Sequence, residues 1–238
     1  HVQKLNTFKS LVPIVIFVGI PALLVFKQPD LGTSLVYLAI LFGMLFVGGI
    51  RMRLVQIIVG VAVVLAPLGW FVLKEYQKQR ILVFLNPNID PFGAGYHIIQ
   101  SKIAIGSGMI LGKGLFEGTQ SQLNFLPENH TDFIFSVIGE ELGFVGCFIV
   151  LVLLCVLIYR SIAIAKSAND TFGMLLATGI GSMLVFQVLV NVGMTTGIMP
   201  VTGIPLPFIS YGVSALTTNM LSVGLLLNIA MHRKQLMF

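Results

Sequence analysis

The strongest constraint on this sequence is a series of six apolar runs, each close to the length of a membrane span. A helix needs about 20 predominantly apolar residues to cross a bilayer. Because lipid offers the backbone no hydrogen-bond partners, such runs are expected to be α-helices. We therefore predict an all-α, polytopic integral membrane protein, with one membrane domain over residues 1–238. The predicted transmembrane helices are residues 11–26, 31–50, 54–73, 133–159, 172–195 and 213–231.

Composition argues against a soluble domain. Charged residues make up only 10% of the chain and hydrophobic residues 56%, whereas soluble domains carry about 25% charged residues. The net charge is +5. It does not predict a nucleic-acid partner, because the bases lie at the ends of the apolar runs rather than on one basic face.

The distribution of charge predicts the orientation in the membrane. Cytoplasmic loops of membrane proteins are enriched in Lys and Arg. One side of the predicted membrane carries the bases Lys4, Lys9, Arg51, Arg53, Arg160, Lys166, Arg233 and Lys234. The other side carries the acids Asp30, Glu75, Asp90, Glu117, Glu128 and Asp132. Both chain ends are therefore predicted to face the cytoplasm, and residues 27–30, 74–131 and 196–212 to form loops outside it.

Two of these outer loops are unusual. Residues 74–131 are too long for an ordinary connection and include an amphipathic stretch at 96–105, which predicts short helices on or in the outer leaflet. Residues 196–212 contain three prolines and are predicted to be mostly non-helical. Irregular backbone near a membrane is tolerated only against protein or a wet cavity, so we expect the functional surface on this side.

Asp132 stands at the outer end of the fourth run. On a straight helix, small residues share its face, namely Ser136, Gly139, Gly143 and Gly146. Small residues let another helix approach, so this face is predicted to point inward and Asp132 to border a cavity. The alternative is that Asp132 is only a helix N-cap. Asp30, between the first two runs, has the same two interpretations.

Glu140 and Glu141 lie about two turns farther into the same run. Ionised carboxylates are costly at that depth, so we expect structural support, through an ion pair with a base on a span outside this sequence. The fifth and sixth runs carry polar residues at four-residue spacing, which predict interhelical hydrogen bonds or a polar cavity lining. They are Gln187, Asn191 and Thr195, and Ser214, Thr218 and Ser222.

Three bases on the outer side, Arg80, Lys102 and Lys113, are candidates for holding phosphate groups. Contact with anionic lipid headgroups or solvent is the alternative. His97 and His130 lie outside as well, but their spacing does not indicate a metal site.

Several short strings, collinear over nearly the whole chain, resemble the SEDS family, which comprises RodA, FtsW and their sporulation homologues. They are QPDLGT at 28–33, NP at 86–87 with DP at 90–91, GYHIIQS at 95–101, LPE at 126–128 with HTDFIF at 130–135, EELG at 140–143, and GIPLP at 203–207 with SYG at 210–212. GKG at 112–114 and GTQSQL at 118–123 resemble the RodA members in particular. Val213 and Met109 depart from the pattern, since glycine is common at both positions.

The resemblance implies a fold of ten transmembrane helices, of which this chain holds the last six. It also implies a peptidoglycan glycosyltransferase that polymerises lipid II during cell elongation, with inversion at the anomeric carbon. Asp132 matches the essential acid of the family and is assigned as general base, and Asp30 matches a second cavity acid. Further residues assigned to substrate binding are Arg80, Gln100, Ser101, Lys102, Lys113, His130, Thr131 and Ser210.

The resemblance also implies a location in the bacterial cytoplasmic (inner) membrane with the active site facing outward. The implied partners are a class B penicillin-binding protein and membrane proteins of the elongation machinery. A divalent cation, Mg²⁺ or Mn²⁺, is expected at the pyrophosphate, without assigned protein ligands. Two rival functions share these features: a flippase for the same lipid, and a non-catalytic scaffold that activates a partner. A transporter needs a site near the membrane midplane, whereas the acids here gather at the outer face.

Overall fold

The computed structural model describes residues 8–28, 30–51, 53–57, 60, 61, 64, 71, 74–91, 93–123 and 125–232. Every regular element in these ranges is helical, so the predicted all-α class is confirmed. Most of the predicted span at 54–73 lies outside the described residues, as do Lys4, Arg233, Lys234 and the side chain of Lys9.

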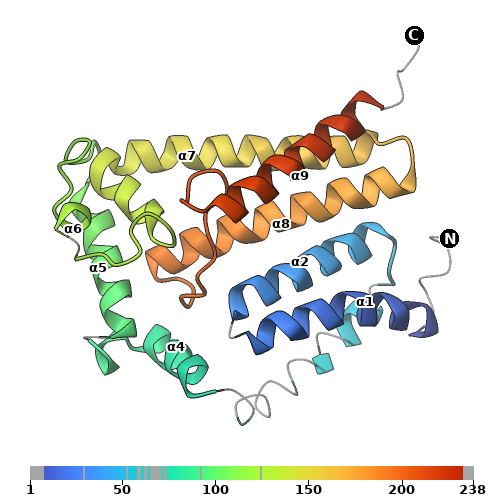
Figure 1. Ribbon diagram of the computed structural model, residues 1–238, viewed down its shortest axis with the longest axis horizontal. Coiled ribbons are helices and arrows are strands. Elements are labelled where there is room, and N and C mark those ends of the chain that lie inside the picture. Colours follow the sequence, from blue (N-terminus) through green and yellow to red (C-terminus); the bar gives the residue numbers. More distant parts are fainter. Residues whose placement is uncertain are drawn as a thin grey trace.

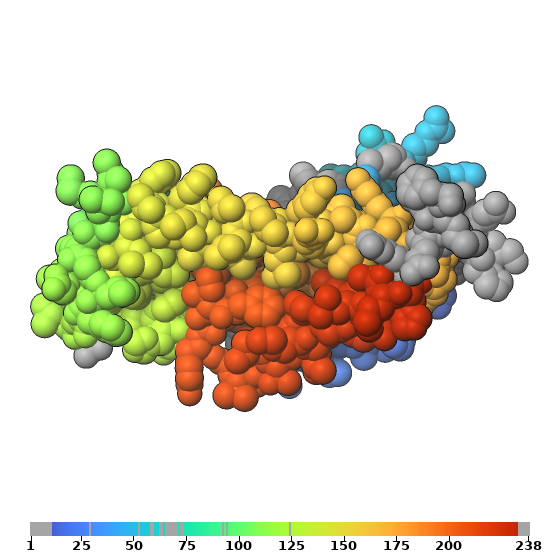
Figure 2. Space-filling view, turned by 90° about the horizontal axis from the view of Figure 1, so that it is seen from above, coloured from blue at the N-terminus to red at the C-terminus, as the bar shows by residue number. Residues whose placement is uncertain are grey.

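Within the described ranges, three helices are long and apolar enough to cross a membrane: α7 (Ile134–Ser167), α8 (Thr171–Thr196) and α9 (Val213–Met231). In Figures 1 and 2, α7 and α9 lie side by side along one face, and α8 packs against both. Their termini follow from local chemistry. The Asp170 side chain accepts a hydrogen bond from Gly173 N at the start of α8, and Gly197 ends that helix in the left-handed conformation, which favours glycine.

Two further apolar helices, α1 (Phe8–Lys27) and α2 (Leu31–Val47), form a hairpin that packs on α8. Asp30 caps α2, because its Oδ1 accepts a hydrogen bond of 2.9 Å from Thr33 N. Ser34 Oγ donates across the hairpin to Ala22 O at 3.2 Å. The start of α2 approaches the segment after α8 so closely that a Cβ at Gly32 would lie 2.6 Å from Thr202 O.

The long loop folds into short helices, as predicted: α4 (Glu75–Leu85), the 3-10 turn η2 (Pro87–Ile89), α5 (Ala94–Ser107) and α6 (Thr119–Gln122). They gather at the end of the molecule where α7 begins, opposite the end where α1 begins and α9 finishes (Figure 1). α5 is packed against α7 and α8, with Ile98 and Ala104 buried. Residues 197–212 contain no helix, also as predicted.

The prediction of one straight helix through Gly143 is wrong. Gly143 interrupts α7 with φ 66° and ψ −161°, a conformation that costs glycine little and other residues much. The backbone of residues 109–114 fills the gap. Phe144 N and Val145 N donate to the carbonyls of that loop at 2.9 and 3.1 Å, and two loop N–H groups donate to Glu140 O and Glu141 O at 3.0 and 3.1 Å.

Candidate active site

Asp132 lies in a short stretch before α7 that is held by its backbone. Three consecutive carbonyls, those of residues 130–132, accept hydrogen bonds from α8 and the segment after it; we call these three bonds the carbonyl clasp. The bonds are Tyr211 N to His130 O at 2.8 Å, Ser210 Oγ to Thr131 O at 2.7 Å, and Asn191 Nδ2 to Asp132 O at 3.0 Å. The catalytic candidate is therefore fixed by residues about 60 to 80 positions later in the sequence.

The Asp132 side chain does not act as a helix cap. Phe133 occupies the N-cap position of α7, and no side chain caps that helix. The carboxylate is half-buried and faces the segment after α8, where a Cβ at Gly203 would lie 3.3 Å from Asp132 Oδ2. Gly203 has φ +75°, so the close approach and the backbone conformation both favour glycine here.

Burial raises the pKa of Asp132 above its ordinary value, and the negative charges of Glu128 and Asp30 raise it further. The positive charge of Arg80 on α4 acts in the opposite direction. Charged groups from three parts of the chain, represented by Glu128, Arg80 and Asp30, thus act on Asp132 at this end of the molecule. The predicted cap of α2 by Asp30 is confirmed, and its charge also acts on Asp132; its place in the substrate cavity stays a prediction.

Arg80 is half-buried, and its guanidinium carbon lies 6.0 Å from the centre of the Tyr76 ring. An arginine is suited to hold a phosphate group, since its planar donor group binds phosphate oxygens in pairs. Of the three bases predicted to hold phosphate, Arg80 is the one whose charge acts on Asp132.

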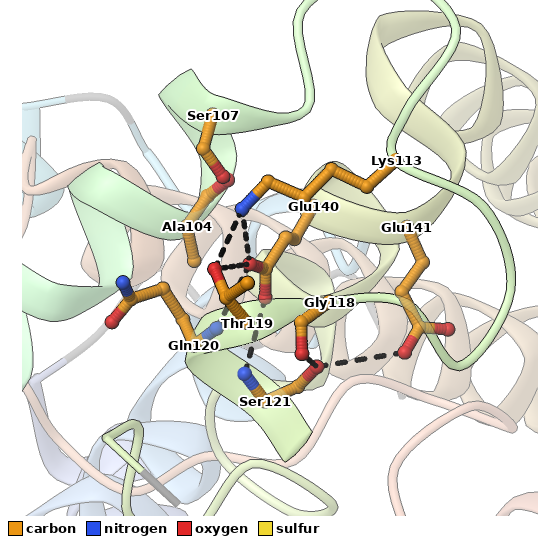
Figure 3. A network of polar contacts seen from close by, with 9 residues as sticks. All are labelled: Ala104, Ser107, Lys113, Gly118, Thr119, Gln120, Ser121, Glu140 and Glu141. Carbon is orange, nitrogen blue, oxygen red and sulfur yellow. Dashed lines mark hydrogen bonds and ion pairs between the residues drawn. The ribbon is translucent and has the colours of Figure 1, made fainter. Parts of the chain in front are cut away.

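Lys113 is engaged elsewhere, in a network around Glu140 (Figure 3). The Glu140 side chain is 0% exposed and forms an ion pair of 2.8 Å with Lys113 Nζ. Further donors to the same carboxylate are Thr119 Oγ1 at 3.2 Å, Gln120 N at 2.9 Å and Ser121 N at 3.1 Å. The expectation of a partner on a span outside this sequence is wrong. Lys113, a base in the long loop at 74–131, pairs with Glu140, and the break in α7 brings that loop against the helix.

Glu141 is held by a longer hydrogen bond than those that hold Glu140. It is largely buried, and Ser121 Oγ donates to its Oε1 at 3.5 Å. The predicted structural role fits both acids, which hold the loop to the part of α7 before its break.

Comparison with known proteins identifies the family. The profile of the FtsW/RodA/SpoVE family, described as a cell cycle protein, matches residues 2–235. This chain belongs to that family. It is 52% identical to the peptidoglycan glycosyltransferase MrdB of Escherichia coli K12, over 93% of this chain and 60% of that protein. The chain thus spans about three fifths of the curated relatives' length.

Solved structures of the family have the same architecture. A chain from a peptidoglycan synthase complex, described as coordinating polymerization and crosslinking, superposes with a TM-score of 0.73 and 36% identity, over 93% of this chain and 60% of that one. The rod shape determining protein RodA of Thermus thermophilus gives a TM-score of 0.64 and 30% identity, over 98% and 61%. The chain is accordingly a multi-pass membrane protein of the FtsW/RodA/SpoVE fold.

Three residues assigned to substrate binding make structural contacts, and their substrate role stays a prediction. Ser101 is fully buried, and its hydroxyl lies 2.6 Å from both Ser136 Oγ and Thr195 O, so it fastens α5 to α7 and α8. Ser210 is largely buried and belongs to the carbonyl clasp. The exposed Lys102 lies over Gly197, the C-cap of α8, where the helix dipole favours a cation.

The other residues assigned to substrate binding are Thr131 and His130, which directly precede Asp132, and Gln100 on α5. Thr131 Oγ1 donates to Glu128 Oε2 at 3.0 Å and so orients the acid that acts on Asp132. His130 is exposed and lines an open pocket of about 400 Å³ with Ile134, Ile209 and Tyr211. Gln100 is half-buried on α5, and its role stays a prediction.

His97 was not assigned to the site from the sequence, yet it adjoins it. Its ring stacks on Phe133, the neighbour of Asp132, at 6.1 Å between centres. Burial lowers the pKa of His97, while the charges of Glu128 and Asp90 partly oppose this effect. The string GYHIIQS points to α5 but not to this contact, which depends on how α5 docks.

The divalent cation was expected at the pyrophosphate, without assigned protein ligands. Among the described residues, no three His, Cys, Asp or Glu side chains are grouped so that they could hold a metal ion. The expected Mg²⁺ or Mn²⁺ stays a prediction.

Proposed function

We propose that this chain carries the catalytic centre of a peptidoglycan glycosyltransferase, which polymerises lipid II at the outer face of the bacterial cytoplasmic membrane. The observation that supports this most directly is the Asp132 carboxylate, fixed through its backbone and placed where acids and burial raise its pKa. A general base works best with a pKa near the operating pH. The family membership and the curated name of the MrdB relative agree with this reaction.

The proposed step is one displacement. The 4-hydroxyl oxygen of the acceptor sugar forms a bond to the anomeric carbon of the donor, and Asp132 takes the hydroxyl proton. The bond from that carbon to the undecaprenyl pyrophosphate breaks, and the pyrophosphate leaves with the electron pair. Attack from the face opposite the leaving group inverts the configuration. Arg80 is placed to stabilise charge that develops on the pyrophosphate.

We further propose that the enzyme acts with a class B penicillin-binding protein in the elongation machinery. The structural similarity to a chain of a peptidoglycan synthase complex supports an enzyme that works beside a crosslinking partner. The proposed outward orientation rests on the charge asymmetry of the loops. Two of the bases that define this asymmetry, Arg160 and Lys166, lie in the half of α7 that is farther from Asp132.

A flippase is the second candidate, because transporters often use broken helices and α7 is broken at Gly143. In this chain the backbone of residues 109–114 already hydrogen-bonds four groups at the break, namely Glu140 O, Glu141 O, Phe144 N and Val145 N, so these four are not open to a substrate. The geometry therefore favours chemistry at the outer surface.

The deciding experiment is polymerisation of labelled lipid II by the complete purified protein with its partner, comparing wild type with Asp132→Asn. Asparagine keeps the size of the side chain but cannot take a proton, so we expect a loss of about 100- to 10,000-fold in rate. Glu117→Gln, an exposed acid in the same loop, serves as the matched control and should retain wild-type activity. Substantial polymer from Asp132→Asn would overturn the mechanism.

A further inference from the structure

Asn191 is an α8 residue whose contacts are unlike those of its polar neighbours. Thr195, one turn later on α8, turns its hydroxyl back to its own helix, with bonds to Asn191 O and Val192 O at 3.0 Å. Asn191 instead reaches across to two other segments. Its Nδ2 donates to Asp132 O at 3.0 Å and to Ile204 O at 2.8 Å.

These two acceptors flank the Asp132 carboxylate. One belongs to Asp132 itself, and the other adjoins Gly203, whose backbone faces Asp132 Oδ2. The amide therefore sets the distance between the general base and the segment opposite it. Its orientation is fixed by this network, because the reversed amide would place Oδ1 against two carbonyl oxygens.

If position 191 served only to stabilise α8, an apolar side chain would be expected there rather than asparagine. The side chain is 0% exposed, and no described residue donates a hydrogen bond to its buried Oδ1. A buried acceptor without a partner destabilises a fold. Leucine would fill a similar volume without such an acceptor, but it would take away the donor that Asp132 O and Ile204 O now share. What asparagine adds is a pair of N–H donors directed at the two sides of the site.

We propose that Asn191 is a positioning residue for Asp132, holding it at the working distance from the segment after α8. The proposal rests on the proposed function, because it assigns Asn191 to the reaction that Asp132 catalyses. Asn191 touches neither substrate nor reacting atoms; it acts through the backbone of Asp132.

The test compares Asn191→Leu with wild type in the complete protein and its partner, using labelled lipid II. Because a small misplacement of a catalytic group can reduce the rate about 100-fold, we expect kcat to fall about 10- to 100-fold with KM nearly unchanged. The acid limb of the pH–rate profile should move to lower pH. A carboxylate released toward water loses the burial, and part of the repulsion from Glu128 and Asp30, that raise its pKa, whereas Arg80 acts in the opposite direction.

Thr195→Val is the matched control. It removes a hydroxyl of equal burial from the same helix without touching Asp132, so kcat and the acid limb should stay at wild-type values. A wild-type kcat and acid limb in Asn191→Leu would overturn the proposal, as would the same losses in Thr195→Val. If Asn191→Leu does not fold, Ser210→Ala replaces it, since it removes the adjacent bond of the carbonyl clasp, with the same direction expected in kcat.

A second readout separates this proposal from the proposed function. The protonation of Asp132 can be followed without substrate by infrared difference spectra, with Asp132→Asn identifying its carboxyl band. If wild type makes no polymer, the proposed function fails. If the Asp132 titration is then the same in Asn191→Leu as in wild type, the positioning role fails as well; a shift to lower pH would support it.

Discussion

At the scale of single residues, the negative charge of Glu128 acts on the proposed base. Its charge is a cause of the raised pKa of Asp132, second to burial, and Thr131 Oγ1 orients its carboxylate. Two nearby carboxylates disfavour each other's ionised forms. Asp132 works as a base only when deprotonated, so its raised pKa places the acid limb of the rate profile higher than for an ordinary aspartate.

We therefore predict that Glu128→Gln shifts the acid limb of kcat/KM to lower pH. Removing the negative charge makes ionisation of Asp132 easier, so more of the base is active in mildly acidic solution. The measurement is polymerisation of lipid II across a pH series, with Glu117→Gln as the control. An acid limb that stays in place, or moves to higher pH, would show that Glu128 does not set the protonation of Asp132.

At the scale of elements, the junction between the outer loop and α7 is held by the Lys113–Glu140 pair. Removing one partner of a buried ion pair typically costs about 3–5 kcal/mol, because the other charge is stranded. The Lys113 side chain is 27% exposed, so water can still reach its charge. We expect Glu140→Gln to lower the free energy of unfolding by an amount at the lower end of that range.

The double variant Lys113→Met with Glu140→Gln tests whether this loss comes from the pair. It should recover part of the stability lost in Glu140→Gln, because no unpaired ammonium group is left. Thermal unfolding in detergent, with a double-mutant cycle, gives the coupling energy. Additive losses from the two single changes would indicate that the carboxylate is held by the loop N–H groups rather than by Lys113.

The elements also show where sequence reasoning succeeds. The apolar run at 213–231 coincides with α9, and the short helices of the long loop were predictable from its amphipathic pattern. The break at Gly143 was not, because its hydrogen-bond partners come from residues 109–114 and a lone glycine equally indicates close helix packing. The hydrogen-bond acceptors of Asn191 could not be predicted from the sequence for the same reason. Four-residue spacing predicts a polar stripe, but the acceptors are brought together only by tertiary structure.

At the scale of the whole molecule, the orientation in the membrane is open to direct test. The loop helices and Asp132 gather at one end, and α1 begins and α9 finishes at the other (Figure 1). Single cysteines at Glu117 and Lys166, both exposed, should differ in labelling by an impermeant thiol reagent in intact cells. The natural cysteines, Cys147 and Cys155, are free and must first be replaced.

We predict labelling at position 117 and protection at position 166, with both sites reacting after the cells are opened. This follows from the excess of Lys and Arg in cytoplasmic loops. Labelling at 166 but not at 117 would reverse the orientation and remove the active site from the outer face.

The closed break in α7 also has a consequence for biogenesis. Residues 109–114, whose backbone hydrogen-bonds to α7 at the break, precede α7 in the sequence and are synthesised first. In the proposed orientation, this segment must cross the membrane before α7 is complete, ready to bond the backbone groups around Gly143. Until it docks, those groups lack these partners, and an unpaired backbone group in lipid costs several kcal/mol. We therefore expect export and docking of the loop to precede stable insertion of α7.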